Sequence, residues 1–159
     1  MPNPEVSLAL EDPRAPAGAA LIGELVAFID ALYPEDADEP PSPWTVDDIA
    51  HTGAFVVARV EDGPAGCAGL VPTAEPGALE IVRMYVRPGH RGRRIADRLL
   101  AELEAQARAR DIAGLLLRCG PRQPDALRVY DRNGYARRPA FAHHREHPTN
   151  IFYEKRLEG

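Results

Sequence analysis

The sequence feature that most constrains the fold is a succession of four segments in the middle of the chain: a strand, a turn, a helix and a second strand. Leu79–Arg87 alternates apolar and polar residues, as a half-buried strand does, and Pro88 ends it. From Ile95 to Ala107, apolar residues recur every three or four positions, which predicts an amphipathic helix. Leu115–Cys119 is a continuous apolar run, typical of a buried parallel strand. The order predicts a crossover in which the helix joins two parallel strands.

Further strands and helices are expected around this unit, each bounded by proline, glycine or acidic residues. The expected strands are Val6–Leu10, Ala54–Glu61, Ala65–Val71, Tyr135–Phe141 and Ile151–Leu157. The expected helices are Ala17–Leu32, Val46–Ala50 and Asp125–Asn133. The polar face of the crossover helix is expected to carry Asp97, Glu102, Glu104, Arg108 and Arg110.

The sequence also predicts several of the connections between these elements. Thr45 with Asp48 three residues later resembles a capping box that opens the second helix. Asp62-Gly63 predicts a hairpin turn, and the polar, proline-rich Tyr33–Pro43 predicts a surface loop.

The length and charge of the chain narrow the function classes. A chain of 159 residues suits one compact domain, so we expect residues 1–159 to form a single unit. The net charge of -5 argues against a nucleic-acid partner, which needs an excess of Lys and Arg. No run approaches the ~20 apolar residues that span a bilayer, so we expect a cytoplasmic protein without a membrane partner. Cys67 and Cys119 lie in apolar runs and are expected to be reduced, buried thiols.

A basic turn precedes the crossover helix. Arg91, Arg93 and Arg94 follow the strand directly and stand where the helix begins. Backbone N–H groups without partners collect at a helix N-terminus, and the helix dipole favours negative charge there. The turn therefore predicts a phosphate site, with a solvated basic loop as the alternative.

This turn resembles the acetyl-CoA signature of the GNAT superfamily of N-acetyltransferases, which reads Arg or Gln, two residues, Gly, one residue, then Gly or Ala. Arg91 and Ala96 fill the outer positions, and Gly92 keeps a glycine within the turn. Arg94 replaces the middle glycine. We expect its Cβ to be tolerated because residues in the first turn of a helix have negative φ.

The order of elements from Ala54 to Leu157 is also similar to that of this family. The resemblance implies an α/β (α+β) fold with a mixed, largely antiparallel sheet of about six to seven strands, splayed between the fourth and fifth, and about four helices. It implies acetyl-CoA as co-substrate, no metal, and a homodimer formed through terminal edge strands. The residues that it implies for cofactor binding are Met84, Tyr85, Val86, Arg91, Gly92, Arg93, Arg94, Ile95, Ala96 and Gln123. Arg128 and Arg132 could reach the cofactor, but we interpret them as surface residues that hold nearby acids.

Two catalytic residues follow from the resemblance. The segment ALRVYDRNGY resembles the family helix whose tyrosine protonates the leaving thiolate, which implies this role for Tyr130, with core packing as the alternative. Glu80 is in register with the general base of related histone acetyltransferases.

Strand alternation sharpens the second assignment. It puts Glu80, Val82, Met84 and Val86 on one face and Ile81, Arg83 and Tyr85 on the other. A carboxylate among apolar neighbours is desolvated and favours proton uptake. A buried ion pair is the alternative, with an arginine other than Arg83 because that side chain points to the opposite face.

The histidines near the C-terminus do not predict a metal site. His143, His144 and His147 precede Pro148 in a polar loop, whereas a two-histidine zinc site needs one face of a helix and a third ligand. We expect this loop, together with Tyr33–Trp44, to line the acceptor pocket.

The function that these features predict is direct transfer of an acetyl group from acetyl-CoA to an amine of a small molecule or peptide. Both cysteines lie within predicted strands, and neither has a histidine nearby in the sequence, so no covalent intermediate is expected. The alternative is a catalytically silent module that binds or senses acyl-CoA.

Overall fold

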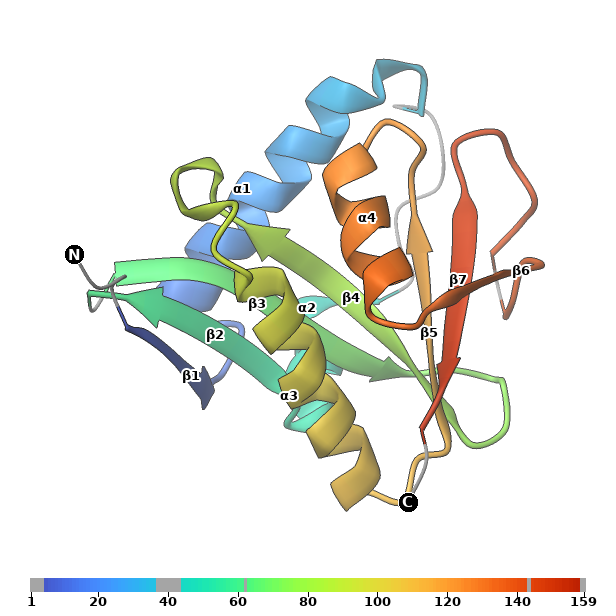
Figure 1. The fold of residues 1–159 in the computed structure, drawn as a ribbon, viewed down its shortest axis with the longest axis horizontal. Coiled ribbons are helices and arrows are strands. Elements are labelled where there is room, and N and C mark those ends of the chain that lie inside the picture. Colours follow the sequence, from blue (N-terminus) through green and yellow to red (C-terminus); the bar gives the residue numbers. More distant parts are fainter. Residues whose placement is uncertain (1–4, 37–43, 62, 143, 158–159) are drawn as a thin grey trace.

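A seven-stranded sheet forms the centre of the molecule, and helices cover both of its faces (Figure 1). The computed structural model describes residues 5–36, 44–61, 63–142 and 144–157. The strands are β1 (Val6–Leu10), β2 (Phe55–Val60), β3 (Gly63–Pro72), β4 (Ala78–Val86), β5 (Gly114–Cys119), β6 (Ala136–Arg138) and β7 (Ile151–Arg156). They lie in the order β1-β2-β3-β4-β5-β7-β6, and only β4 and β5 are parallel. The predicted mixed, largely antiparallel sheet is therefore confirmed.

The helices lie close to the predicted positions. They are α1 (Pro16–Leu32), α2 (Val46–Thr52), α3 (Ile95–Ala109) and α4 (Pro124–Arg132), with short 3-10 turns η1 (Pro34–Asp36) and η2 (Pro88–His90). Helices α1 and α2 cover one face of the sheet, whereas α3 and α4 cover the other (Figure 1). The predicted strand Tyr135–Phe141 is shorter than expected, because the strand ends at Arg138, just before Pro139. None of the helices in the described part of the chain is both long enough and apolar enough to span a bilayer.

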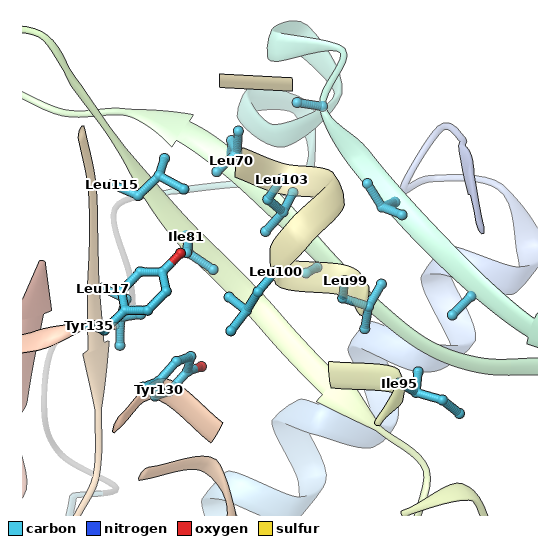
Figure 2. Close-up of a cluster of buried hydrophobic side chains, with 14 of the residues drawn as sticks. Leu70, Ile81, Ile95, Leu99, Leu100, Leu103, Leu115, Leu117, Tyr130 and Tyr135 are labelled. Atoms are coloured by element: carbon cyan, nitrogen blue, oxygen red, sulfur yellow. The ribbon is translucent and has the colours of Figure 1, made fainter. Parts of the chain in front are cut away.

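The main core lies between α3 and the sheet. Leu99, Leu100 and Leu103 of α3 are fully buried, and Figure 2 shows them facing Leu70 of β3 and Leu115 of β5. Burying a leucine side chain stabilises a fold by roughly 1.5–3 kcal/mol. The α3 stripe that the sequence predicts is therefore the main anchor of the crossover helix. A second core on the opposite face comprises Leu21, Leu25, Ile49, Phe55, Val57, Cys67, Val71 and Tyr85.

Glu104 departs from the predicted polar face of α3. Only 7% of Glu104 is exposed. Its carboxylate accepts hydrogen bonds from the Tyr135 hydroxyl and the Lys155 ammonium, both at 3.0 Å. Burial, followed by the Glu104 charge, raises the pKa of Tyr135. The expectation of exposure was wrong because residues C-terminal to α4 cover this flank of α3, which helical periodicity alone does not reveal.

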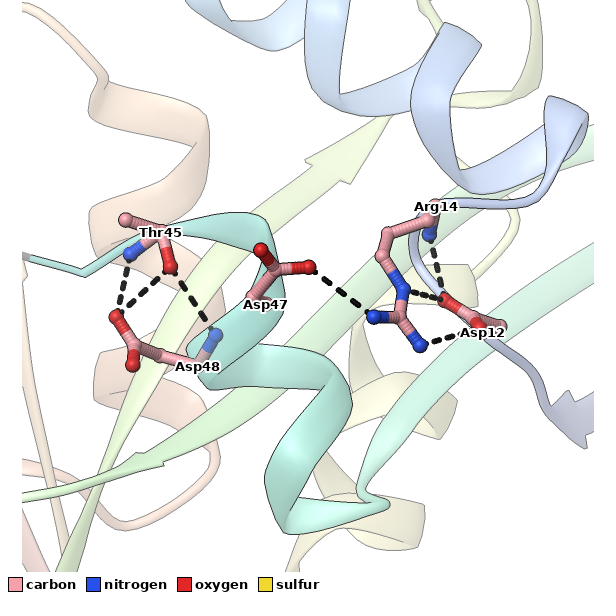
Figure 3. Close-up of polar contacts among 5 residues, drawn as sticks. All are labelled: Asp12, Arg14, Thr45, Asp47 and Asp48. Atoms are coloured by element: carbon pink, nitrogen blue, oxygen red, sulfur yellow. Dashed lines mark hydrogen bonds and ion pairs between the residues drawn. The ribbon is translucent and has the colours of Figure 1, made fainter.

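The predicted capping box at α2 is confirmed (Figure 3). The Thr45 hydroxyl accepts from the Asp48 N–H at 3.2 Å, and the Asp48 carboxylate accepts from the Thr45 N–H at 2.8 Å. The Arg14 guanidinium joins Asp12 and Asp47, at 2.9 and 3.1 Å. These ion pairs are exposed and add little stability, but the capping box fixes the backbone that directly follows Trp44.

The predicted loop Tyr33–Pro43 is only partly described, because residues 37–43 lie outside the described residues, as do Asp62 of the predicted hairpin turn and His143. Tyr33 is not a surface residue, since only 5% of it is exposed. Its hydroxyl accepts a hydrogen bond from the Arg122 N–H at 2.9 Å. Tyr33 therefore joins the end of α1 to the segment that precedes α4.

Candidate active site

Strand β4 contains a β-bulge at the centre of the site. Tyr85 pairs with Cys67 of β3, and Val82 pairs with Gly69. Between these pairs β3 has one residue and β4 has two, Arg83 and Met84. Arg83 adopts a left-handed conformation with φ 58°. The Cys67 thiol donates a weak hydrogen bond to the Arg83 carbonyl at 3.3 Å, which partly compensates for the interrupted ladder.

The bulge overturns the predicted alternation along β4. Val82 packs with the core under α1 and α2, as expected for a residue on the same strand face as Glu80. Met84 and Val86 instead pack with the core under α3, and Tyr85 packs with the core under α1 and α2. The prediction that Glu80, Met84 and Val86 share a face was therefore wrong, because the extra residue reverses the order of faces. Arg83 lines the same cavity as Glu80.

The sheet is splayed beside the bulge, as predicted. Parallel pairing between β4 and β5 covers only Ala78–Ile81 and Gly114–Leu117. Beyond this point, Val82, Tyr85 and Val86 pair with β3, and the opposite edge of residues 82–86 has no strand partner among the described residues. An open strand edge of this kind can pair with an extended ligand.

The basic turn enters α3 through two left-handed residues. Gly92 has φ 83°, and Arg94, the N-cap residue, has φ 60° and ψ 24°. The expectation of a negative φ at Arg94 was wrong, because Arg94 precedes the first helical residue and completes the turn instead of lying within the helix. The Arg94 side chain makes no capping hydrogen bond, so the first turn of this helix lacks the N-cap acceptor that most helices have.

A first cavity, of about 410 Å³, extends from this turn along the open edge of β4. Nine of the ten predicted cofactor residues line it, and the exception is Arg93. They are Met84, Tyr85, Val86, Arg91, Gly92, Arg94, Ile95, Ala96 and Gln123. The buried His90 Nδ1 also belongs to this wall and has no hydrogen-bond partner among the described residues. A phosphate-bearing ligand fits this donor set, since the wall offers a helix N-terminus, arginines and an unsatisfied ring nitrogen.

Two residues of the first cavity come from α1 and were not predicted. Leu25 and Phe28 line it opposite the turn. The Arg91 guanidinium lies 5.5 Å from the centre of the Phe28 ring, and its Nε donates to the Val86 carbonyl at 3.1 Å. Phe28 is 37% exposed, and its place in the cavity wall follows from the packing of α1 against the turn, which the sequence alone does not reveal.

Arg128 and Arg132 also line the first cavity, but both are paired with acids, as the surface interpretation predicts. Arg128 forms an ion pair with Asp125. Arg132 forms an ion pair with Asp97 at 2.5 Å, and its hydrogen bonds lower the pKa of that carboxyl to about 2. The pair therefore stays charged in all but strongly acidic solution.

A second cavity, of about 880 Å³, lies on the other side of the open edge. The loop that contains His144 lines it, and so do α1 and Tyr33. Glu80, with 3% exposed, also lies in this wall. The described residues contain no group of three or more His, Cys, Asp or Glu that could hold a metal ion.

Glu80 is held by two nitrogen-bearing rings instead of an arginine. His144 Nε2 lies 2.9 Å from one carboxylate oxygen, and Trp44 Nε1 donates to the other at 3.4 Å. The His144 side chain is 12% exposed. The sequence predicts that the segments of both ring residues line the pocket, but it does not link them to Glu80, because these segments are far from Glu80 in the chain.

Tyr130 lies where the two cavities meet. It is 5% exposed and contacts the rings of Tyr135 and Tyr153, with ring centres 5.9 and 5.6 Å away. Burial raises the pKa of Tyr130 far above its ordinary value, so its hydroxyl keeps its proton. Five residues line both cavities: Leu25, Met84, Gln123, Ala126 and Tyr130. A ligand in each cavity would therefore meet the other beside the Tyr130 ring.

Comparison with known proteins agrees with this architecture. A model of the acetyltransferase (GNAT) family matches residues 24–135. The chain is 35% identical over 156 residues to an IAA acetyltransferase of Azospirillum brasilense, covering 97% of this chain and 99% of that protein. A candidate acyl-CoA N-acyltransferase of Klebsiella pneumoniae has a similar structure, with TM-score 0.78, 34% identity, and 96% and 98% of the two chains covered. The PaiA N-acetyltransferase of Thermoplasma acidophilum, solved with coenzyme A, shares the fold with TM-score 0.67 at 14% identity, over 96% and 99% of the chains.

Proposed function

The chain belongs to the GNAT family of acetyltransferases, and from this premise we propose that it transfers the acetyl group of acetyl-CoA to the amine of a small molecule or peptide within a ternary complex. The observation that carries the proposal is the wall of five residues shared by the two cavities. A donor in one cavity and an acceptor in the other would be held together at this wall. Such positioning converts a bimolecular reaction into an effectively unimolecular one.

Acetyl-CoA would occupy the first cavity. The N–H groups at the start of α3, with Arg91 and Arg94, would hold the pyrophosphate, and the orphaned His90 Nδ1 offers a further polar contact. The open edge of Met84–Val86, where the Val86 carbonyl already accepts from Arg91, would bind the pantetheine arm as a short added strand. This arrangement directs the thioester towards the shared wall, since Met84 belongs to both cavities.

Glu80 would take a proton from the acceptor amine in the second cavity. Its contact with Trp44, at 3.4 Å, is the longer of its two hydrogen bonds, so that oxygen is the easier one to give to an incoming ammonium. His144 would hold the other oxygen and fix the carboxylate plane. Once the proton has moved to Glu80, the amine lone pair is free to attack the acetyl carbonyl.

Tyr130 would return a proton to the leaving thiolate. Its hydroxyl keeps its proton because burial raises its pKa, and it lies at the wall where the thioester sulfur would arrive. A thiolate left in a buried site is costly, so a nearby acid favours collapse towards products.

A covalent acetyl-cysteine route is disfavoured. Cys119 lines the second cavity, but burial raises its pKa to about 11, which leaves little thiolate at neutral pH. Cys67 is fully buried, and burial raises its pKa to about 12. Direct attack by the amine requires neither thiol.

The test combines binding with turnover. Acetyl-CoA is expected to raise the melting temperature of the wild-type protein, and a panel of amines is screened for release of free CoA thiol. Glu80→Gln and Tyr130→Phe are each expected to lower kcat by roughly 10²–10⁴-fold while keeping the acetyl-CoA shift. Arg98→Gln is the control, since this side chain lies outside both cavities and donates to the Val6 carbonyl.

The outcomes separate three interpretations. Stabilisation by acetyl-CoA without thiol release for any amine would overturn the transfer proposal in favour of a module that only binds acyl-CoA. Release that is unchanged in both variants would overturn the roles of Glu80 and Tyr130 while leaving the transfer reaction in place.

A further inference from the structure

One cation in the second cavity has no role in the proposed transfer. The Arg83 side chain lines this cavity, and no hydrogen bond or ion pair joins its guanidinium to any residue in the described ranges. The Arg83 carbonyl accepts a hydrogen bond from the Cys67 thiol, which leaves the guanidinium uninvolved in that contact. Arg83 is half-buried, and a guanidinium removed from water is normally paired, so a bound anion would supply the partner that the described residues do not provide.

The electrostatic surroundings of Arg83 lead to the same conclusion. Burial lowers the pKa of Arg83, the positive charge of Arg118 lowers it further, and the negative charge of Glu80 only partly opposes these effects. Glu80 already accepts hydrogen bonds from its two ring partners. An anion bound at Arg83 would offset both the desolvation of the guanidinium and its repulsion by Arg118.

The backbone at Arg83 supports a role in binding as well. The residue adopts φ 58°, a conformation that asparagine or glycine would adopt at lower cost than arginine. Strained conformations of this kind cost of order 1–3 kcal/mol and cluster at ligand-binding sites. An arginine in this position puts a large cation at the bulge, where the fold itself favours a smaller residue.

We propose that the acceptor is an amine that also carries a carboxylate, and that Arg83 is the residue that binds this carboxylate. The inference rests on the proposed transfer reaction, because it describes the acceptor of that reaction. Arg83 directly precedes Met84 of the shared wall, and Glu80 lies three residues earlier in the same cavity. One amino acid could therefore place its carboxylate at Arg83 and its amine at Glu80.

A carboxylate fits this cavity better than a phosphate or phosphonate. The guanidinium binds a carboxylate through two parallel hydrogen bonds. The other charged residues of the wall are of both signs: Asp30, Asp36, Glu80, Arg118, Arg145 and Glu146. Because four of them are acids, a doubly charged anion would be repelled more strongly than a single carboxylate. Arg118, which is exposed and donates to the Asn150 side chain at 2.7 Å, would contribute less than Arg83.

The experiment measures release of CoA thiol for each common amino acid against its primary amide, its decarboxylated amine and its aminophosphonate analogue. The wild-type protein is expected to prefer the carboxylate over the amide by roughly 10- to 100-fold in kcat/KM, as a charge-assisted hydrogen bond allows. In Arg83→Asn, which tolerates the left-handed backbone, this preference is expected to disappear through a rise in KM for the amino acid. Turnover of the neutral amide should change little.

Further variants guard against misfolding and nonspecific effects. Arg83→Lys keeps the charge and is expected to retain part of the preference, whereas Arg98→Gln removes a cation outside the cavity and should leave the preference unchanged. Melting temperatures check that each variant folds.

Each result supports or overturns the proposal. Transfer to neutral amines with no preference for the carboxylate would overturn it while leaving acetyl transfer intact, and so would a stronger preference for aminophosphonates. Equal losses for amino acid and amide in Arg83→Asn would assign Arg83 a structural role. Absence of thiol release for every amine would overturn the transfer reaction itself and this inference with it.

Discussion

Replacing Arg94 with glycine removes a strained residue from the start of α3. Arg94 has φ 60°, and its side chain is 71% exposed, with only a distant ion pair to Asp97 at 3.8 Å. A left-handed conformation costs a residue with a Cβ about 1–2 kcal/mol. Glycine avoids this cost but loses about 0.4–1 kcal/mol through the greater freedom of the unfolded chain. Arg94→Gly is therefore expected to unfold less readily than Arg94→Ala.

The comparison with alanine isolates the backbone effect, because both variants lose the same charge and ion pair. The expected difference is about 0.5–1 kcal/mol in the free energy of unfolding. For a chain of this length, it corresponds to a rise in melting temperature of roughly 1–4 °C. Urea denaturation and thermal unfolding followed by circular dichroism, both without acetyl-CoA, measure the two quantities.

Gly92→Ala is the matched control in the same turn. Gly92 has φ 83°, and an added Cβ would meet no atom within 4 Å. Its substitution should therefore cost about 1 kcal/mol through the backbone alone, with the opposite sign to Arg94→Gly. The reasoning would be refuted if Arg94→Gly were no more stable than Arg94→Ala while Gly92→Ala was neutral.

Three further predictions concern stability and chemistry. Since Arg132 lowers the pKa of Asp97 from 3.8 to about 2, the stability that Asp97 contributes should be complete above pH 4 and lost as the pH falls through 2. Urea denaturation between pH 2 and 5 should show the difference between wild type and Asp97→Asn shrinking over this range; a constant difference would contradict the assignment. Gly120→Ala should cost about 1–3 kcal/mol in urea denaturation, because the new Cβ would overlap the Tyr33 hydroxyl, and a neutral substitution would show that Tyr33 is not packed there. Cys119→Ser should retain CoA release within a few-fold, whereas a loss beyond ~100-fold in a folded variant would establish a thiol intermediate.

Much of the fold could be predicted because its signals are local. The α3 leucines recur with helical spacing, Thr45 and Asp48 form a capping box within one turn, and the apolar β5 run marks a buried strand. Each of these features depends on residues only a few positions apart. Propensity and patterning were sufficient in such cases.

The errors have a different origin, since they depend on neighbours that are distant in the sequence. Strand β4 contains no glycine or proline that would indicate the bulge at Arg83. The bulge arises from the pairing of β4 with β3. Glu104 is buried because Tyr135 and Lys155 reach it from the last third of the chain. The partnership of Glu80 with His144 likewise joins residues 64 positions apart. The chemistry of the second cavity was therefore hidden from the sequence, although its individual residues were visible.

The gap between β4 and β5 also bears on how the protein avoids unwanted association. A row of unpaired backbone groups is a template on which strands of other molecules add, and this is a common route to aggregation. Here the row lies inside the sheet, with residues of α1 and α4 lining the cavities on either side. The Arg91 side chain also covers the Val86 carbonyl. A narrow, flexible ligand can enter this gap, whereas a strand of another protein, with its side chains and neighbouring strands, is too wide. The fold therefore has an unpaired strand edge that can bind a ligand but does not promote aggregation.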